Sequence, residues 1–277
     1  MLSRIAPSQA ERTAGALGSE TLERASRCFR GDGALIIEDI IDAGIITEAR
    51  RKFAESYSQY LDDSEYDDAL KVGNRRLMIT IDMEPPFDNP VLFANPYLLA
   101  VLRATFNGDF VIGAYGVVCS LPSAMAQPRH LDGGILFPLS GIDRILPPAA
   151  ITVGIPLLEM NEVHGTTALW LGTHRDEERS RAVRDRSSEF DEESIKPVVQ
   201  EGSCILWDFR LVHAGTPNRG MVPRPLLYLT YCRSWFVDDG NFGTKENPKQ
   251  KPLLAKSDFL MGLSEPHQRL LARARAS

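Results

Sequence analysis

The sequence predicts an α+β domain whose core is a sandwich of mainly antiparallel β-strands. Helix-like segments occupy the first part of the chain, and from Phe110 the composition changes to apolar strand-like runs separated by Gly, Pro or Asn. An apolar content of 43% and a charged content of 25% are typical of a globular protein with a sizeable core. We therefore expect one domain over residues 1–277, with a jelly-roll core at about 108–237.

The N-terminal part is predicted to be mainly helical. Residues 1–18 are polar and rich in small side chains, and we expect them to be mobile. A short helix is predicted over Thr21–Phe29, and a buried strand over Ala34–Ile37. Asp42 is placed to cap a further helix, which runs to about Tyr60.

Three more segments precede the strand-rich half. The acidic stretch Asp62–Asp68 is predicted to be a solvated loop. Leu77–Ile81 is typical of a strand, and Asn95 or Pro96 begins a helix that ends at Phe106.

The second half carries the strands that we expect to form the sandwich. A charged excursion over Arg175–Glu193 interrupts them, and a helix over Glu265–Ala274 follows them near the C-terminus. The strand-like runs are Phe110–Leu121, Ile151–Leu158, Thr166–Leu171, Ser203–Phe209 and Leu226–Phe236.

The composition argues against several classes of partner. A net charge of −6 leaves no basic surface for nucleic acid. No apolar run approaches the roughly 20 residues that span a bilayer, and the N-terminus lacks the apolar core of a signal peptide. The four cysteines are far apart and three lie in apolar runs, which favours buried free thiols in a reducing cytoplasm. We expect a cytoplasmic monomer or homodimer that acts on a small molecule.

A candidate metal site lies in the segment Gln127–Gly134. On an extended segment, His130 and Asp132 point to the same side, because strand side chains repeat every two residues. His213 follows an apolar strand-like run and can close a three-ligand face. Two imidazoles and one carboxylate, with the remaining positions open, suit non-haem Fe(II) and its oxygen chemistry. The alternative is a chance His-x-Asp pattern in a loop.

Arg224 is the second candidate, at the entrance of the strand-like run that follows His213. A hairpin return through the intervening Gly- and Pro-containing segment brings its guanidinium beside the metal. There it can bind one carboxylate bidentately while the far end of the same molecule meets the metal. A dicarboxylate with a keto group beside one carboxylate, such as 2-oxoglutarate, satisfies both contacts. The alternative is that Arg224 is a surface charge.

In four segments the sequence resembles the phytanoyl-CoA dioxygenase family of Fe(II)/2-oxoglutarate oxygenases. The resemblance spans roughly residues 33–242, with the motifs in matching order. It implies a double-stranded β-helix flanked by N-terminal and C-terminal helices. The segments are Gln127–Gly134, His164–His174, Gly202–Asp208 and His213–Arg224.

The resemblance implies a role for each residue that matches a family motif. His130, Asp132 and His213 match the iron ligands and are therefore the expected catalytic centre. Arg224 matches the residue that binds the distal carboxylate of 2-oxoglutarate.

Further contacts with the co-substrate are implied by weaker matches. Gln127 matches a glutamine and Thr167 a threonine that contact 2-oxoglutarate. Arg76 resembles an additional anionic contact, although its neighbour Arg75 is an alternative. His164 stands where asparagine-like residues are usual, so either a substrate contact or a turn cap is expected there.

The implied reaction uses Fe(II), 2-oxoglutarate and O2, and it hydroxylates a substrate C–H bond while releasing succinate and CO2. Asp132 argues against halogenation, because related halogenases carry a small residue at that position. Desaturation and epoxidation stay open. A cupin-type metalloenzyme that uses Zn or Mn for hydrolysis or isomerisation is an alternative, and so is a non-catalytic, ligand-sensing relative.

The substrate is expected to be a small or medium-sized organic molecule with an anionic group, such as an amino-acid derivative or a natural-product intermediate. This expectation rests on arginines near the site-forming segments, and on aromatic residues that are expected to line a pocket. The arginines are Arg75, Arg76, Arg129, Arg210 and Arg233, and the aromatic residues are Tyr115, Phe137 and Trp235.

Overall fold

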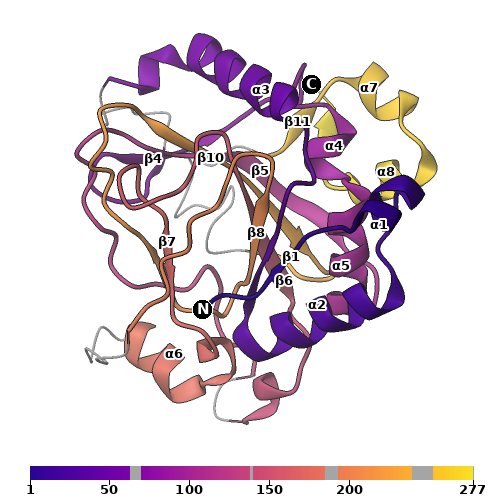
Figure 1. Cartoon of the computed structure of the whole chain (residues 1–277), viewed down its shortest axis with the longest axis vertical. Coiled ribbons are helices and arrows are strands. Elements are labelled where there is room, and N and C mark those ends of the chain that lie inside the picture. Colours follow the sequence, from indigo (N-terminus) through magenta and orange to yellow (C-terminus); the bar gives the residue numbers. More distant parts are fainter. Residues whose placement is uncertain (63–69, 138–139, 185–192, 239–251, 277) are drawn as a thin grey trace.

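The computed structural model describes residues 1–62, 70–137, 140–184, 193–238 and 252–276. Its main feature is an eight-stranded sheet, with helices packed on one side and a smaller sheet on the other (Figure 1). In spatial order the strands of the main sheet are β1 (Arg4–Ile5), β2 (Ala34–Ile37), β8 (Cys204–Asp208), β6 (Ala150–Pro156), β10 (Arg224–Cys232), β5 (Val111–Ser120), β4 (Arg76–Thr80) and β3 (Leu70–Lys71).

β10 is the central strand of this sheet, although it is the last of its strands in chain order. It pairs antiparallel with β5 on one side and with β6 on the other. Only the β1–β2 pair in the main sheet is parallel, among the strands that the structure describes. The smaller sheet pairs β7 (Thr167–Leu169) with β9 (His213–Gly215).

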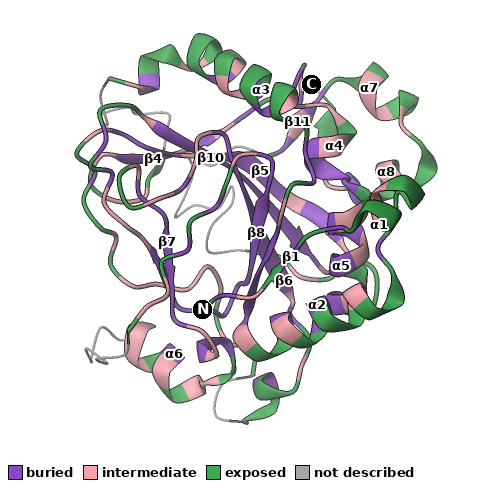
Figure 2. Ribbon diagram, in the orientation of Figure 1, coloured by how far each residue is buried: buried purple, intermediate pink, exposed green. Residues whose placement is uncertain are grey.

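The alternation of side chains along β10 divides the main sheet into two faces. Leu227 and Leu229 are buried in the large core that the helices cover, whereas Arg224, Leu226 and Tyr228 line a cavity on the opposite face. Figure 2 shows the strands almost wholly buried and the helices exposed on their outer sides. The sheet therefore uses one face for the core and the other for the cavity.

Several of the helices begin at residues whose side chains cap them. Asp42 accepts a hydrogen bond from Gly44 N–H at 2.7 Å, and Asn95 accepts from Tyr97 N–H at 3.1 Å. Both residues were predicted as helix starts. The helices are α1 (Gln9–Ala14), α2 (Ser19–Asp32), α3 (Ala43–Ser56), α4 (Pro90–Phe93), α5 (Pro96–Phe106), α6 (Glu177–Arg184), α7 (Ser257–Gly262) and α8 (Glu265–Leu270).

The α+β class predicted from the sequence is confirmed, and each of the five predicted strand runs contains a strand. Several short strands were missed. β9 was expected only as a strand end at His213, and β1, β3, β11 (Leu254–Ala255) and β12 (Arg275–Ala276) were not predicted. Residues 1–18 were expected to be mobile, but Arg4–Ile5 pairs with β2, and Leu2 and Ile5 are buried. The N-terminus is therefore held by its apolar side chains and by backbone hydrogen bonds.

The remaining differences concern surface segments. The excursion over Arg175–Glu193 contains α6, and the predicted C-terminal helix ends at Leu270 rather than Ala274. Most of the acidic stretch Asp62–Asp68 lies outside the described residues. All four cysteines are free, as expected. In the part of the chain that the structure describes, no helix is long and apolar enough to cross a membrane.

Candidate metal centre

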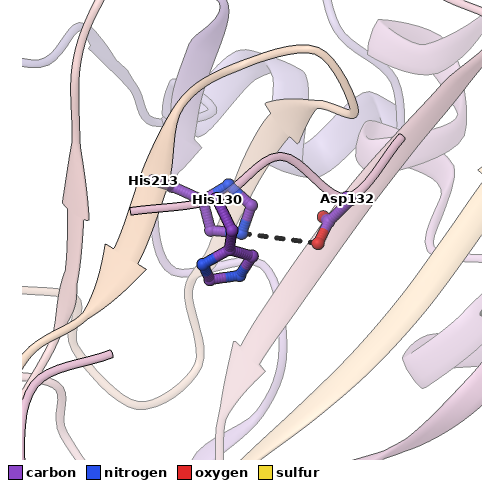
Figure 3. Close-up of side chains that lie close together, drawn as sticks. All are labelled: His130, Asp132 and His213. Carbon is purple, nitrogen blue, oxygen red and sulfur yellow. Dashed lines mark ion pairs between the residues drawn. The ribbon is translucent and has the colours of Figure 1, made fainter. Parts of the chain in front are cut away.

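His130, Asp132 and His213 come together (Figure 3), and all three line the cavity. One potential ligand atom from each residue lies within 4.8 Å of the others. The two histidines also form a backbone bridge, in which the N–H of each donates to the carbonyl of the other at 3.0 Å. This bridge joins the segment after β5 to β9 and explains how two parts of the chain that are far apart share one site.

Backbone carbonyls fix the orientation of both imidazoles. His130 Nδ1 lies 3.0 Å from the carbonyl oxygen of Pro128, and His213 Nδ1 lies 2.9 Å from that of Leu211. A carbonyl oxygen only accepts hydrogen bonds, so each Nδ1 must carry the proton. Each Nε2 is therefore the atom available to bind a metal. The hydrogen bond from Nδ1 to the carbonyl oxygen holds the ring in this orientation.

Asp132 is held in a comparable way through one of its two oxygens. Oδ2 accepts from Thr152 Oγ1 at 2.7 Å and from Trp207 Nε1 at 2.9 Å. Oδ1 lies 3.4 Å from His213 Nε2. The aspartate thus directs Oδ1 toward the two histidines, which is the geometry of a monodentate carboxylate ligand.

The charges of the three residues match this geometry. Burial, and then the nearby His213, lower the pKa of His130 to about 4, so its imidazole is neutral at neutral pH. Burial alone would raise the pKa of Asp132, but the charge and hydrogen bond of His213 hold it well below its ordinary range. Burial lowers the pKa of His213, but the charge and hydrogen bond of Asp132 outweigh burial and raise it overall. A divalent metal would take the place of the proton that His213 shares with Asp132.

The cavity that these residues line has a volume of about 1090 Å³, and its lining also contains two arginines. Arg76 and Arg224 line it with exposed fractions of 1% and 2%. Arg76 and Arg224 lie on the strands that flank β5, and both pair with Ser120 in the register of the sheet. Both guanidinium groups donate to Ser120 Oγ, Arg76 from Nε at 2.7 Å and Arg224 from Nη2 at 3.0 Å.

This arginine pair has hydrogen-bonding capacity that the protein does not satisfy. Arg76 Nη1 and the Nε and Nη1 of Arg224 are buried without a partner among the described residues. Burial lowers the pKa of Arg76 to about 9, with Arg224 as a second cause, and burial lowers the pKa of Arg224 to about 10. Two buried cations with unused donors form a site for an anion, and a carboxylate fits their fork geometry.

The neighbouring residues make room for this pair. A Cβ at Gly215 would lie 2.1 Å from Arg76 Nη1 and 2.6 Å from Gln127 Oε1, so any other residue there would displace these side chains. Gln127 Oε1 accepts from the Gly215 N–H at 2.9 Å, and its Nε2 donates to Val72 O. Gln127 therefore fixes the backbone of β9. Gln127 and Thr167, which lies on β7, both line the cavity.

The structure also decides between two residues that the sequence left open. Arg76 lines the cavity, whereas Arg75 Nε donates to the carbonyl oxygen of Pro122 at 2.8 Å, and Arg75 does not contribute to the lining. His164 does not line the cavity, and its N–H donates to Asn161 Oδ1 in a turn.

Several residues expected near the substrate point elsewhere. Arg210 forms an ion pair with Asp208, and Arg233 donates to the carbonyl oxygen of Phe106. Tyr115 is buried on the helix side, where its hydroxyl donates to Phe87 O at 2.9 Å. Trp235 and Phe137 are 62% and 52% exposed and do not line the cavity.

Other lining residues were missed by the sequence analysis. Trp207 and Thr152 hold Asp132, and Tyr228 lines the cavity two strand repeats after Arg224. Once Arg224 is taken to face the cavity, the period of two along β10 assigns Leu226 and Tyr228 to the same face. That signal was available in the sequence.

The sequence matches a known protein family over the part of the chain that contains this site. The family described as Phytanoyl-CoA dioxygenase (PhyH) matches residues 29–226, which include all three residues of the candidate metal centre. Dioxygenase FrzG of Cladobotryum sp is 23% identical over 228 residues, which cover 75% of this chain and 72% of that protein. Iron/alpha-ketoglutarate-dependent dioxygenase penM of Penicillium thymicola is 26% identical, over 72% of this chain and 64% of its own length. The chain therefore spans less than two thirds of penM.

Solved structures show the same fold. The non-heme alpha ketoglutarate dependent epimerase SnoN from nogalamycin biosynthesis matches with a TM-score of 0.60 and 16% identity, over 78% of this chain and 82% of SnoN. AviO1 from Streptomyces viridochromogenes Tue57 matches with a TM-score of 0.57 and 20% identity, over 80% of this chain and 99% of AviO1. At these identities the likeness concerns the fold alone. The match over residues 29–226 is more than half of the sequence, and it shows that the chain belongs to the phytanoyl-CoA dioxygenase family.

Proposed function

We propose that the chain is an Fe(II)- and 2-oxoglutarate-dependent dioxygenase that hydroxylates a C–H bond of a small or medium-sized organic molecule. The reaction consumes O2 and releases succinate and CO2. His130, Asp132 and His213 are the proposed iron ligands, and Arg76, Arg224, Gln127 and Thr167 are the proposed co-substrate contacts. Membership of the family and the description of penM as iron- and alpha-ketoglutarate-dependent support this proposal.

The observation that carries the proposal is the pairing of the metal centre with the arginine pair in one cavity. The three ligand atoms converge within 4.8 Å of one another, and buried guanidinium donors of the same cavity have no partner in the described protein. A molecule that chelates a metal at one end and carries a carboxylate at the other satisfies both. 2-Oxoglutarate has this chemistry.

Each group of residues has a defined task in the proposed reaction. Iron with 2-oxoglutarate and O2 supplies the oxidant for the C–H bond. His130, Asp132 and His213 would hold the metal, and all three line the cavity in which the co-substrate and the substrate would bind. Arg76 and Arg224 hold the distal carboxylate and so fix the direction of the co-substrate. His213 and both arginines are buried, which limits the contact of these three side chains with water.

The proposed substrate carries an anionic group, and Arg129 is the residue proposed to contact it. Arg129 lines the cavity directly before His130, and its guanidinium lies 4.9 Å from the ring centroid of Trp170. Arg76 and Arg224 are proposed to bind the co-substrate. Among the described residues that line the cavity, this leaves Arg129 as the arginine that can contact the substrate. A natural-product intermediate is the proposed class, and a solved structure of the same fold is the epimerase SnoN from nogalamycin biosynthesis.

We also propose that the chain is one domain with a double-stranded β-helix at its centre. The main sheet supplies one wall of the cavity and the β7–β9 sheet supplies the other, with His213 on the smaller sheet and Arg224 on the larger one. Two facing sheets with a metal between them are the arrangement that this fold requires.

An anaerobic titration tests the proposal. Fe(II) and 2-oxoglutarate together are expected to give a weak visible charge-transfer absorption that neither gives alone. Under air, candidate substrates are then screened for substrate-dependent succinate release and for a product that has gained one oxygen atom. The absence of both the absorption and succinate would rule the proposed function out. A cupin-type Zn or Mn enzyme, the alternative, has no need of the buried arginine pair.

A further inference from the structure

A buried ion pair lies on the segment that connects two parts of the metal centre. Arg210 and Asp208 are 6% and 1% exposed, and the guanidinium donates to Asp208 Oδ1 at 2.9 Å and to Oδ2 at 2.7 Å. Asp208 directly follows Trp207, which holds the Asp132 carboxylate, and Arg210 shortly precedes His213. The proposed reaction uses neither residue of this pair.

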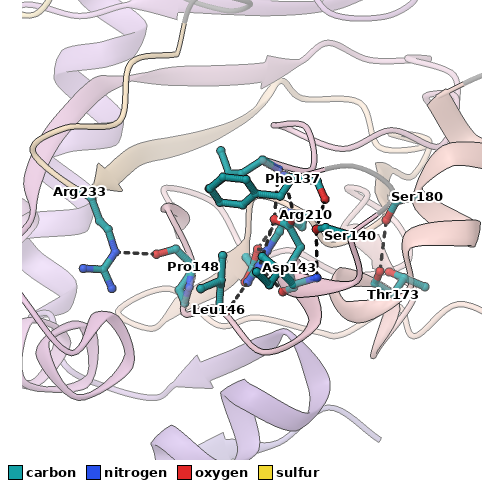
Figure 4. Close-up of polar contacts among 12 residues, drawn as sticks. Phe137, Ser140, Asp143, Leu146, Pro148, Thr173, Ser180, Arg210 and Arg233 are labelled. Atoms are coloured by element: carbon teal, nitrogen blue, oxygen red, sulfur yellow. Dashed lines mark hydrogen bonds and ion pairs between the residues drawn. The ribbon is translucent and has the colours of Figure 1, made fainter.

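The other donors of Arg210 reach a different part of the chain. Nη1 donates to the carbonyl oxygen of Asp143 at 2.8 Å, and Nη2 donates to that of Leu146 at 3.3 Å (Figure 4). The carboxylate of Asp143 in turn accepts from the N–H of Leu136 at 3.1 Å and from that of Phe137 at 2.8 Å. Asp143 is itself only 4% exposed. Arg210 and Asp143 therefore join three stretches of chain through buried, directional contacts.

The stretch that Asp143 holds is a wall of the cavity. Residues 133–136 line the cavity directly after Asp132. At the start of this wall, Gly133 N–H donates to Phe209 O at 3.0 Å, and a Cβ at Gly133 would lie 2.7 Å from Phe209 Cδ2. The wall is thus fixed at one end by Phe209 and at the other by Asp143.

Buried charges of this kind are weak sources of stability, because their desolvation offsets their mutual attraction. Well-packed apolar side chains would stabilise the fold as effectively. The network does supply a fixed geometry, since both oxygens of Asp143 accept from successive backbone N–H groups and the guanidinium fork matches Asp208. Loss of this network is therefore expected to change the position of the wall more than the stability of the fold.

We propose that Asp143 and Arg210 are positioning residues that fix the wall formed by residues 133–136, and that this wall determines how the substrate lies against the metal centre. They act through the wall and take no part in holding iron or 2-oxoglutarate. The substrate part of this inference rests on the proposed function, whereas the attachment of the wall does not.

The first test measures the wall itself. Hydrogen exchange is followed in peptides that contain Leu136 and Phe137, in the full chain with and without Fe(II) and 2-oxoglutarate under anaerobic conditions. Asp143→Ala is expected to speed exchange of these two amides roughly tenfold or more, because they lose their acceptor. Asp143→Asn keeps the shape and one carbonyl oxygen, so an intermediate effect is expected. The control is Glu201→Gln, which removes a partly exposed ion pair with Arg50 outside the cavity lining.

The second test separates positioning from ligand binding. In Asp143→Asn, the Fe(II)/2-oxoglutarate absorption is expected to titrate as in the wild type, within about twofold. With a substrate found by the succinate screen, KM and the succinate formed per hydroxylated product are expected to rise, while kcat changes less. Unchanged exchange in both Asp143 variants would overturn the attachment of the wall. Faster exchange with unchanged KM and unchanged succinate per product would overturn its role in placing the substrate, and lost iron or 2-oxoglutarate binding would contradict a role confined to the wall. If the wild type gave no absorption, the proposed function would fail, and the exchange comparison would still decide the role of Asp143.

Discussion

Arg76 and Arg224 donate to the same acceptor, Ser120 Oγ, from the two strands on either side of β5. No described carboxylate lies within ion-pair distance of either guanidinium, so the ligand-free protein holds two buried like charges side by side. This arrangement is unfavourable until an anion binds. Anion binding and folding stability are therefore coupled at this end of the cavity.

Replacing one of these charges tests that coupling. Arg224→Met keeps most of the side-chain volume and is expected to weaken 2-oxoglutarate binding by roughly 2–5 kcal/mol, because a buried carboxylate loses its partner. Without 2-oxoglutarate, the variant is expected to be more stable than the wild type by about 1–4 kcal/mol, because an apolar side chain replaces a buried ion. Thermal unfolding with and without 2-oxoglutarate measures both effects. Loss of iron binding in this variant would contradict the assignment of Arg224.

A methyl group at Gly215 probes the same end of the cavity without removing a charge. Gly215→Ala places a Cβ 2.1 Å from Arg76 Nη1, so the flexible arginine must move away from the co-substrate. Weaker 2-oxoglutarate binding with unchanged iron binding is the expected result in the anaerobic titration. Gly31→Ala is the control, because its Cβ meets nothing within 4 Å and alanine favours α2 by about 0.5–1 kcal/mol. Equal 2-oxoglutarate affinity in both variants would count against a role for Arg76.

The hydrogen bond from Trp207 to Asp132 makes a prediction about the metal. Trp207→Phe removes the donor at 2.9 Å from Asp132 Oδ2 and preserves an aromatic ring. Iron affinity is expected to fall roughly 10–100-fold, as is usual when a residue that orients a metal ligand loses its contact. Equilibrium titration with Fe(II) measures this, and the exposed Trp235 gives the matched control Trp235→Phe. A normal iron affinity in Trp207→Phe would mean that Thr152 alone orients the carboxylate.

Metal binding is also expected to raise the free energy of unfolding. A divalent metal at about 100 times its Kd is expected to stabilise the wild type by about 2.7 kcal/mol, because it binds the folded state. His130→Ala is expected to abolish this increment in thermal unfolding, since one of three ligands is lost. His164→Ala is expected to retain it, because His164 lies outside the cavity lining. Stabilisation that survives in His130→Ala would place the metal elsewhere.

The sequence predicted the metal centre because its signals are local and chemical. His130 and Asp132 are two residues apart on an extended segment, and their shared direction follows from strand geometry alone. Arg224 was predicted to face the site from its position at a strand entrance, and the structure places it in the cavity lining. The long strands were predicted because each has enough apolar residues to show its period.

The missed features depend on pairings that no local pattern reveals. β9 has only three residues, and β1 has two, paired in parallel with Ile36 and Ile37. Arg210 was expected near the substrate, but its partner Asp208 and the carbonyl of Asp143, 67 positions away, direct it into the protein. Which charged residue faces a cavity and which is tied to a distant backbone is decided by tertiary contacts.

The central place of β10 in the main sheet has a consequence for synthesis on the ribosome. β5 and β6 each pair with β10, and the order of the described strands leaves no direct pairing between them. A nascent chain that has not yet extended beyond Cys232 therefore holds two half-sheets with unpaired edges, which are prone to association with other chains. Arg224 begins the strand that joins them. The arginine pair of the cavity and the continuity of the sheet are thus completed together, by one late stretch of the polypeptide.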